Sequence, residues 1–324
     1  MLLSMDDTLS AQGSSKHVPV LLEATMAYLH PENGGLFLDG TFGGGGHTRA
    51  MLESSPEVCV VAIDQDPEAE ERALALKKLY GDRFSFHSTN FADMGDLEEQ
   101  SFDGILFDFG LSSFQLDEGE RGFSFRFDAP LDMRMNNREG ITASEFLESA
   151  SEADLIRAIR NYGEERSWRK VIAAILGARG KGILGRTKSF ADLIESVIPR
   201  RAGFKERIHP ATRTFQGVRI AINNELESIE AGLEEGFRRL KVNGVMVAIS
   251  FHSLEDRIVK RFFRKLSGRP EHRKDDRFQE EREILGSMIE TKAVKAKEDE
   301  IRENTRSRSA RMRGIKKLIE GVAS

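Results

Sequence analysis

Three aspartates, Asp39, Asp64 and Asp108, each stand at the end of a short apolar run. A carboxylate in such a position accepts hydrogen bonds from the hydroxyl and amino groups of a ligand, and it attracts cationic groups. A fourth apolar run ends at Ser250. Ligands of open parallel sheets sit at the carboxyl ends of the strands, so these side chains are expected to share one site.

Between the first two aspartates lies a glycine corner, residues 40–47, with four consecutive glycines at 43–46. Glycine allows positive φ and lets a ligand approach the main chain closely. A strand, a glycine turn and a helix N-terminus in this order are typical of nucleotide-binding corners. Asp64 ends the next run, where a carboxylate accepts hydrogen bonds from ribose hydroxyls. The corner therefore predicts a nucleoside-containing cofactor, whereas a ligand-free surface loop would need neither the buried strand nor Asp64.

Two cofactors compete for this corner. A dinucleotide would place its pyrophosphate against Asp39, which would repel it. S-adenosylmethionine carries a sulfonium and an amino group and no phosphate, so a methyl donor is the favoured ligand. We expect Asp39 to face the amino group or the sulfonium, Asp64 to bind the ribose, and Phe91 to lie against the adenine. An NAD-dependent oxidoreductase is the alternative.

The elements that must position these residues follow from the apolar pattern. Strands are predicted at 36–40, 58–63, 83–88 and 103–108, with helices near 46–54 and 67–80. This βαβ series predicts an α/β fold with a parallel sheet and right-handed crossovers. The region 113–215 has helical signals and no convincing strand, and strand 245–250 then resumes the sheet. The predicted organisation is a disordered extension (1–16), a discontinuous sheet domain (17–112 and 216–324) and a helical insertion (113–215).

Composition narrows the class of protein. The chain has 324 residues, 39% of them hydrophobic, and its only cysteine is Cys59. Without a run of about 18 apolar residues no helix is expected to span a membrane, and a single cysteine favours a reducing cytoplasm. The seven histidines show no ligand spacing such as H-E-x-x-H, so no metal is expected.

The net charge of −5 conceals two basic clusters. One lies within 199–219 and the other within 302–317. The first includes the residues predicted to bind nucleic acid, which are Arg200, Arg201, Lys205, Arg207 and Arg213. Basic clusters on an acidic protein are typical of focused phosphate contacts, although a solvated basic face would give the same pattern.

The chain resembles the bacterial small-subunit (16S) ribosomal RNA (cytosine-N4)-methyltransferase family. The matching motifs lie, in order, at 17–22, 39–47, 108–115, 120–125, 130–135, 162–166, 209–216, 250–257 and 304–309. They span almost the whole chain, and several are too long to agree by chance. The chain departs from the family at Gly44, where a charged or bulky residue is usual, and at Phe114, where the family has proline.

The resemblance implies a class I, Rossmann-like methyltransferase with a helical insertion after the fourth strand, using S-adenosylmethionine. Its substrate would be one cytidine near the decoding centre of 16S ribosomal RNA in the small subunit. The family's donor-binding positions fall on Gly45, Gly46, His47, Asp64, Phe91, Asp108 and Gln115. Neither departure falls on one of them.

The group that accepts the cytosine proton is not fixed by any motif. Asp108 and the backbone of 110–113 are the nearest candidates, while His252 could assist proton removal or simply pack or cap a helix. Arginines of the insertion, Arg121 among them, are expected to hold the RNA. A catalytically silent ribosome-assembly factor with the same fold is the alternative function.

Overall fold

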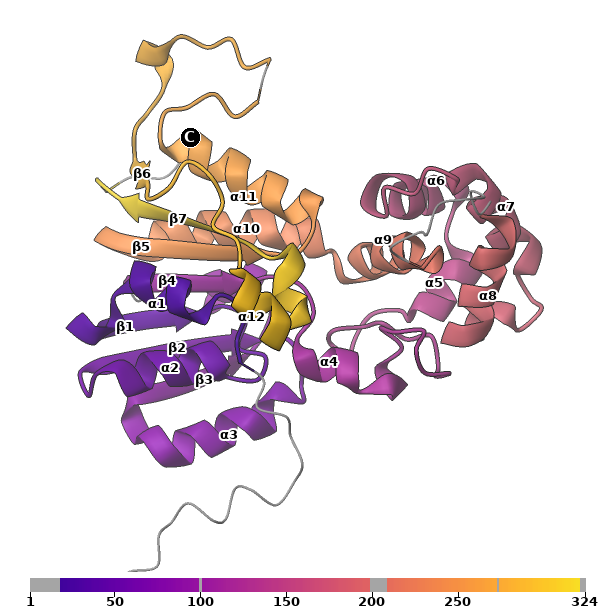
Figure 1. Ribbon diagram of the computed structural model, residues 1–324, viewed down its shortest axis with the longest axis horizontal. Coiled ribbons are helices and arrows are strands. Elements are labelled where there is room, and N and C mark those ends of the chain that lie inside the picture. The colour runs from indigo at the N-terminus through magenta and orange to yellow at the C-terminus, as the bar shows by residue number, and fades with distance from the viewer. Residues whose placement is uncertain (1–17, 99–100, 199–208, 273, 321–324) are drawn as a thin grey trace, which may run out of the picture.

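The computed structural model describes residues 18–98, 101–198, 209–272 and 274–320. These residues form a seven-stranded sheet in the order β3-β2-β1-β4-β5-β7-β6 (Figure 1). Its strands are β1 (Gly35–Asp39), β2 (Val58–Asp64), β3 (Phe84–Ser88), β4 (Phe102–Asp108), β5 (Leu240–Ser250), β6 (Gly286–Met288) and β7 (Arg311–Lys317). Strands β1 to β5 run parallel, and β7 runs antiparallel to both β5 and β6. The predicted α/β fold is confirmed, but the antiparallel edge was not predicted.

Helices cover both faces of the sheet because successive residues of each buried strand point to opposite sides. Phe37 packs with buried residues of α1 (Leu22–Leu29), α2 (Gly46–Ser54) and α3 (Ala69–Tyr80). Leu38, the next residue of β1, packs with α10 (Glu225–Arg239) and α11 (Ser253–Leu266). This double cover fixes the strand ends, and with them the side chains at the carboxyl edge.

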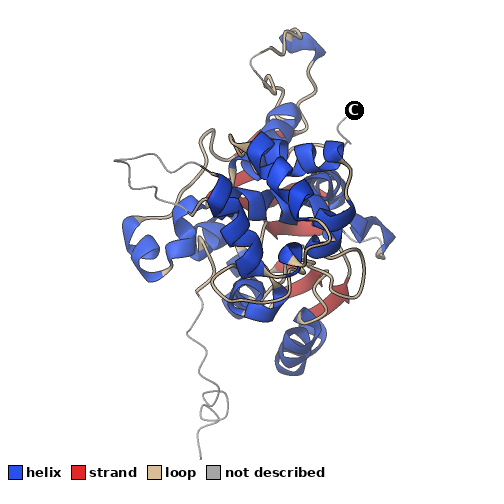
Figure 2. Ribbon diagram, turned by 90° about the vertical axis from the view of Figure 1, so that its right-hand side faces the viewer, coloured by secondary structure: helices blue, strands red, loops and turns tan. Residues whose placement is uncertain are grey.

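A lobe of helices leaves the sheet after β4 and returns through α9 (Figure 1). Its helices are α4 (Ser113–Asp117), α5 (Ala143–Ser149), α6 (Glu152–Ile156), α7 (Trp168–Ala178), α8 (Thr187–Val197) and α9 (Ala211–Asn223). The view onto this side shows helices and loops in front of the strands (Figure 2). The lobe has its own hydrophobic core, which includes Ala211 and Val218. The predicted boundary at 215/216 therefore falls inside α9.

The chain after α11 forms the antiparallel edge and the short helix α12 (Glu298–Glu303). It returns close to the start of the described chain, where the Leu21 N–H donates to Glu300 Oε1 at 2.7 Å. The predicted extension 1–16 lies outside the described residues. Among those described, no helix is both long and apolar enough to cross a membrane.

Candidate active site

A cavity of about 440 Å³ lies at the carboxyl ends of β1, β2 and β4. Its volume falls in the range of small-molecule sites. The cavity is lined by the glycine corner and by every residue to which the resemblance gave a donor-binding role, namely Gly45, Gly46, His47, Asp64, Phe91, Asp108 and Gln115. The structure thus brings these seven residues together at one sheet edge.

The Asp64 carboxylate accepts hydrogen bonds from two backbone N–H groups, one of them in the glycine corner. The Gly43 N–H donates to Asp64 Oδ2 at 2.6 Å, and the Asp66 N–H donates to Oδ1 at 2.9 Å. Gly43 has a φ of +51°, a left-handed conformation that glycine adopts without strain. Burial raises the pKa of Asp64, and the two N–H donors act against that shift. A carboxylate has about four lone-pair positions, so Asp64 can still accept two ligand hydroxyls.

Asp39 lies beneath the cavity and not in its lining. Its Oδ2 accepts from the Thr48 hydroxyl at 2.7 Å, and its Oδ1 accepts from the Thr41 N–H at 3.2 Å. Burial raises its pKa to about 6. In this arrangement Asp39 ties the end of β1 to α2 and holds the turn. The expected contact with the amino group or the sulfonium stays a prediction that this placement does not favour.

Phe91 and Gln115 also line the cavity, and each is held by its neighbours. The Phe91 ring lies 5.6 Å from the ring of Phe107, and a Cβ at Gly232 of α10 would come within 2.4 Å of it. Glycine at 232 therefore lets α10 pass over the ring. Gln115 is held at both ends of its amide, since Nε2 donates to Asp66 Oδ2 at 2.8 Å and Oε1 accepts from the Ser112 N–H at 3.0 Å.

Arg121 is not available to RNA in this structure. Its guanidinium is 3.1 Å from Asp66 Oδ2 and also donates to the carbonyls of Arg134 and Met135. Its side chain is only 9% exposed. The expectation that Arg121 grips RNA is wrong: the buried pair Asp66–Arg121 instead joins β2 to the start of the lobe and orients Gln115.

Asp108 presents a polar atom that nothing in the described chain satisfies. Its N–H donates to the Thr41 hydroxyl at 2.6 Å, but its Oδ1 is buried without a hydrogen-bond partner. Burial, followed by the charges of Asp39 and Glu255, raises its pKa well above the ordinary value. Buried polar atoms are rarely left unpaired, so an unpaired carboxylate oxygen at a cavity suggests a ligand that donates to it.

His47 stands next to Asp108, with Nδ1 3.9 Å from Oδ2. Burial lowers its pKa to about 4, so the ring is neutral near pH 7. Its Nε2 lies 3.2 Å from the Val20 carbonyl, which can only accept. Nε2 therefore carries the proton, and the bare Nδ1 faces Asp108.

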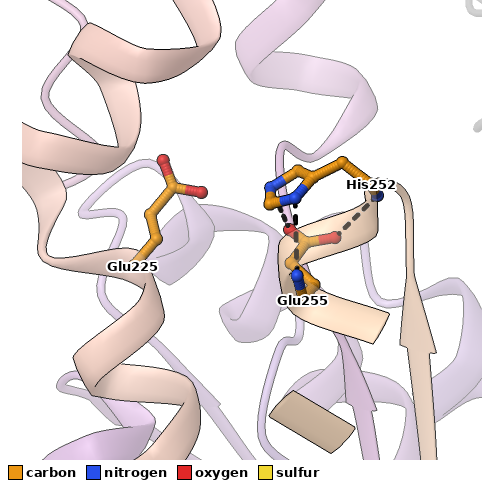
Figure 3. Close-up of side chains that lie close together, drawn as sticks. All are labelled: Glu225, His252 and Glu255. Carbon is orange, nitrogen blue, oxygen red and sulfur yellow. Dashed lines mark hydrogen bonds and ion pairs between the residues drawn. The ribbon is translucent and has the colours of Figure 1, made fainter. Parts of the chain in front are cut away.

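Behind the cavity rim, His252 lies with two buried glutamates, Glu225 and Glu255 (Figure 3). His252 caps α11, and Glu255 Oε2 accepts from the N–H groups of Phe251 and His252 at 2.7 and 3.1 Å. The His252 Nε2 lies 3.1 Å from Glu255 Oε1, yet neither atom has a well-directed hydrogen bond within the described chain. Burial acts to raise the pKa of Glu255, but the contact with His252, the charge of Arg219 and the Phe251 N–H together lower that pKa.

Both oxygens of Glu225 accept from Arg219, at 2.7 and 2.9 Å. The ligand atoms of Glu225, His252 and Glu255 lie within 4.8 Å of one another, a spacing that a metal ion could bridge. The Arg219 guanidinium already supplies a cation there, so the set does not suit a second one. Glu225 lines the cavity, whereas His252 does not. Neither glutamate was predicted from the sequence. Glu255 could have been found from its place three residues after His252, which is the spacing of a capping box.

The sequence matches the MraW methylase family over residues 14–318. The chain belongs to this family. It is 44% identical over 312 residues to a protein of Geobacter sulfurreducens named ribosomal RNA small subunit methyltransferase H, covering 93% of this chain and 99% of that protein. It is also 44% identical to the protein of the same name from Parvibaculum lavamentivorans, covering 94% and 90% of the two chains.

Solved structures with a related arrangement include a putative methyltransferase from Streptococcus mutans in complex with SAH. The match covers 93% of this chain and 100% of that one, with 8% identity and a TM-score of 0.43. The family match and the sheet order identify a class I, Rossmann-like methyltransferase fold with S-adenosylmethionine as the methyl donor.

The cavity of this methylase fits that donor. Asp64 retains accepting positions for ribose hydroxyls, and Phe91 offers an aromatic wall. The carboxylates of Asp64 and Asp108 would repel a pyrophosphate, so a dinucleotide suits this cavity less well.

The residues predicted to bind RNA lie away from this cavity or outside the described chain. Arg213 is on α9, partly buried, and does not line the cavity. Arg200, Arg201, Lys205 and Arg207 fall outside the described residues. Their role stays a prediction.

Proposed function

We propose that this methylase transfers a methyl group from S-adenosylmethionine to the N4 amine of one cytidine near the decoding centre of 16S ribosomal RNA, within the small ribosomal subunit. The observation that carries the chemistry is the unpaired, buried Oδ1 of Asp108 in the donor cavity. The substrate class is supported by the relatives named for ribosomal RNA of the small subunit.

The exocyclic amine of cytosine is a poor nucleophile because its lone pair delocalises into the ring. A fixed acceptor for one N–H orients the amine and concentrates the lone pair on nitrogen. Asp108 Oδ1 is the acceptor we assign, with the backbone of residues 110–113 as the rest of the rim. When bound, S-adenosylmethionine supplies the electrophilic methyl group.

The protonation state of Asp108 decides whether it can do this. Its raised pKa means that the carboxyl is neutral at low pH, and a protonated oxygen is a weaker acceptor. An amine N–H that donates to Oδ1 favours the ionised form and draws the pKa down. Activity should therefore rise with pH through the pKa of Asp108.

His252 and Glu255 act as positioning residues in this proposal. A Cβ at Gly110 would lie 3.7 Å from Glu255 Oε1, so this carboxylate lies beside the loop that follows Asp108. Gly110 has a φ of +93°, and glycine is the residue that takes this conformation readily. Glu225 brings a further carboxylate to the rim from α10. Direct proton removal by His252 stays a prediction.

The helical lobe and the basic residues around it would hold the RNA. A lobe with its own core is superfluous for a free nucleoside, and cationic side chains near 200–213 would contact phosphates. We place the enzyme in the cytoplasm, where the small subunit of bacteria is assembled.

The test supplies labelled S-adenosylmethionine and three acceptors: small subunits that lack the modification, protein-free 16S RNA, and free cytidine. We expect transfer to small subunits and little or none to cytidine. Efficient turnover of free cytidine would contradict the proposal. Donor binding without transfer to any acceptor would instead favour a silent assembly factor.

A further inference from the structure

The donor carries one anionic group, the carboxylate of its methionine part, and the acids of the cavity cannot bind it. Asp64 and Asp108 suit hydroxyl, amino or cationic groups and repel a carboxylate. The carboxylate therefore needs a part of the lining that presents cations or free N–H groups. Among the lining residues that the structure describes, the guanidinium groups are those of Arg49 and Arg306.

Arg306 follows α12 and lines the cavity. One nitrogen of its guanidinium is hydrogen-bonded, and another has no hydrogen-bond partner within the described chain. Its Nη2 donates to Asp117 Oδ1 at 2.9 Å, and its backbone N–H donates to Asn304 Oδ1 at 3.1 Å. Its Nη1 is buried without a hydrogen-bond partner within the described chain. An orphaned guanidinium N–H is costly, so an acceptor is expected opposite it.

The segment carrying Arg306 is fastened beside the start of α2. Asn304 Nδ2 donates to the Val18 carbonyl at 3.1 Å, and Ser307 Oγ donates to Glu300 Oε1 at 2.8 Å. The neighbouring Pro19 packs so closely on Gly46 that a Cβ there would lie 2.4 Å from Pro19 Cγ. The C-terminal segment, the residues before α1 and the first residue of α2 thus meet at one end of the cavity.

The N-terminus of α2 offers a second attraction for an anion at the same place. Its N-cap, Gly45, makes no side-chain hydrogen bond to the first turn, so the first N–H groups of this nine-residue helix lack a side-chain cap. Free N–H groups and the helix dipole favour an anion there. A guanidinium beside them would add a charge-assisted hydrogen bond.

We propose that Arg306 binds the carboxylate of the methyl donor through Nη1, together with the N-terminus of α2. Asp117 holds the guanidinium in place through Nη2. The C-terminal segment thereby becomes part of the donor site. This inference rests on the methylase assignment and is independent of which RNA is the substrate. It predicts that Arg306 makes the site prefer ligands that retain the carboxylate.

The experiment measures donor affinity by calorimetry on the full chain without RNA. The ligands are S-adenosylmethionine and decarboxylated S-adenosylmethionine, which keeps the sulfonium and the amine. Arg306→Gln should weaken S-adenosylmethionine binding by about 10- to 100-fold and leave the decarboxylated ligand within about 2-fold of its parental affinity. Arg306→Lys should recover part of the loss, since a cation remains.

Arg308→Gln is the matched control, because Arg308 is an exposed arginine two residues along that does not line the cavity. It should leave both affinities unchanged. Equal loss of both ligands in Arg306→Gln would overturn the proposal, as would an unchanged affinity for S-adenosylmethionine. Loss of discrimination in Arg49→Gln but not in Arg306→Gln would assign the carboxylate to Arg49. Affinity for 16S RNA is measured separately for the same variants. Weaker RNA binding by Arg306→Gln, with donor affinity unchanged, would make a phosphate the ligand of Arg306 and overturn the proposal.

Discussion

The donor side and the acceptor side of the cavity use the same residue type in opposite ways. On the donor side, both oxygens of Asp39 and both oxygens of Asp64 accept hydrogen bonds from the glycine corner and its neighbours. On the acceptor side, Asp108 Oδ1 lacks a hydrogen-bond partner within the described chain. The two carboxylates of the donor side are thus already satisfied, whereas Asp108 presents an oxygen that an incoming base could satisfy.

This contrast has an energetic basis. Leaving a buried acceptor unpaired costs on the order of 1–3 kcal/mol, so unpaired atoms persist where a bound partner repairs them. Satisfied carboxylates hold a turn in shape before the ligand arrives, which lowers the ordering cost of binding. Changes on the acceptor side should therefore mainly reduce the rate, and changes on the donor side should mainly reduce affinity or stability.

The largest effect is expected for Asp108→Asn. The amide keeps the size of the side chain but replaces the charged acceptor, so the rate of methyl transfer at saturating donor should fall by about 10²- to 10³-fold. The parental rate should rise with pH, because the acceptor must be ionised and its pKa is raised. Single-turnover measurements across pH test both points. A rate within 3-fold of the parent, with the same pH profile, would show that Asp108 is not the acceptor.

The second prediction concerns Asp39 and stability. Its folded pKa of about 6 exceeds the unfolded value of 3.8, so the folded chain loses stability relative to the unfolded chain as pH rises through that window. Relative to Asp39→Asn, the parent should lose about 2 kcal/mol of unfolding free energy between pH 4 and 6.

The comparison with the variant is needed because His47 titrates with the opposite sign. Its folded pKa of about 4 lies below the unfolded 6.5, so its contribution is gained as pH rises and lost as pH falls through that range. Urea denaturation of both chains at several pH values isolates Asp39. If the unfolding free energies of the parent and of Asp39→Asn change in parallel with pH, the raised pKa of the buried Asp39 carboxyl is contradicted.

Asp64→Ala should weaken S-adenosylmethionine binding by on the order of 1–3 kcal/mol, since ribose hydroxyls and the Gly43 N–H lose their acceptor. NAD should show no measurable binding to the parent. Asp82→Ala, which removes an exposed carboxylate after α3, is the control and should bind the donor normally. Tight binding of NAD, with no binding of S-adenosylmethionine, would show that NAD is the cofactor.

The last prediction separates RNA affinity from chemistry. Replacing Arg200, Arg201, Lys205 and Arg207 with Ala should raise the apparent RNA dissociation constant and reduce its salt dependence by up to about 0.7–0.9 per lost phosphate contact. Donor affinity should stay unchanged, because none of the four matches a donor-binding position. Loss of donor affinity with an intact salt slope would show that the cluster has been assigned to the wrong part of the protein.

The sequence predicted the parts of this site that local pattern controls. Apolar runs ending in Asp39, Asp64 and Asp108 gave the strand ends, and the glycines gave the turn between β1 and α2. The pattern could not reveal that both carboxylate oxygens of Asp39 accept hydrogen bonds from Thr41 and Thr48, because these bonds depend on how α2 packs against β1.

Long-range contacts account for the rest. Glu225 reaches the rim only because Asn224, at φ +49°, turns the chain between α9 and α10. Arg306 lies about 260 residues from the glycine corner along the chain and meets it through the antiparallel edge, whose strand β7 was not predicted. Arg121, as an arginine of the insertion, was expected to be exposed to RNA, yet its buried guanidinium pairs with Asp66.

The measurement that tests the central claim most directly is mass-spectrometric mapping of 16S RNA after reaction with the purified enzyme. Small subunits lacking the modification are treated with S-adenosylmethionine and either the parent or Asp108→Asn, and the RNA is digested and sequenced by fragment mass. The account predicts one new N4-methylcytidine near the decoding centre with the parent and almost none with the variant. A methyl group on another atom, at several unrelated positions, or equally abundant with Asp108→Asn would contradict it.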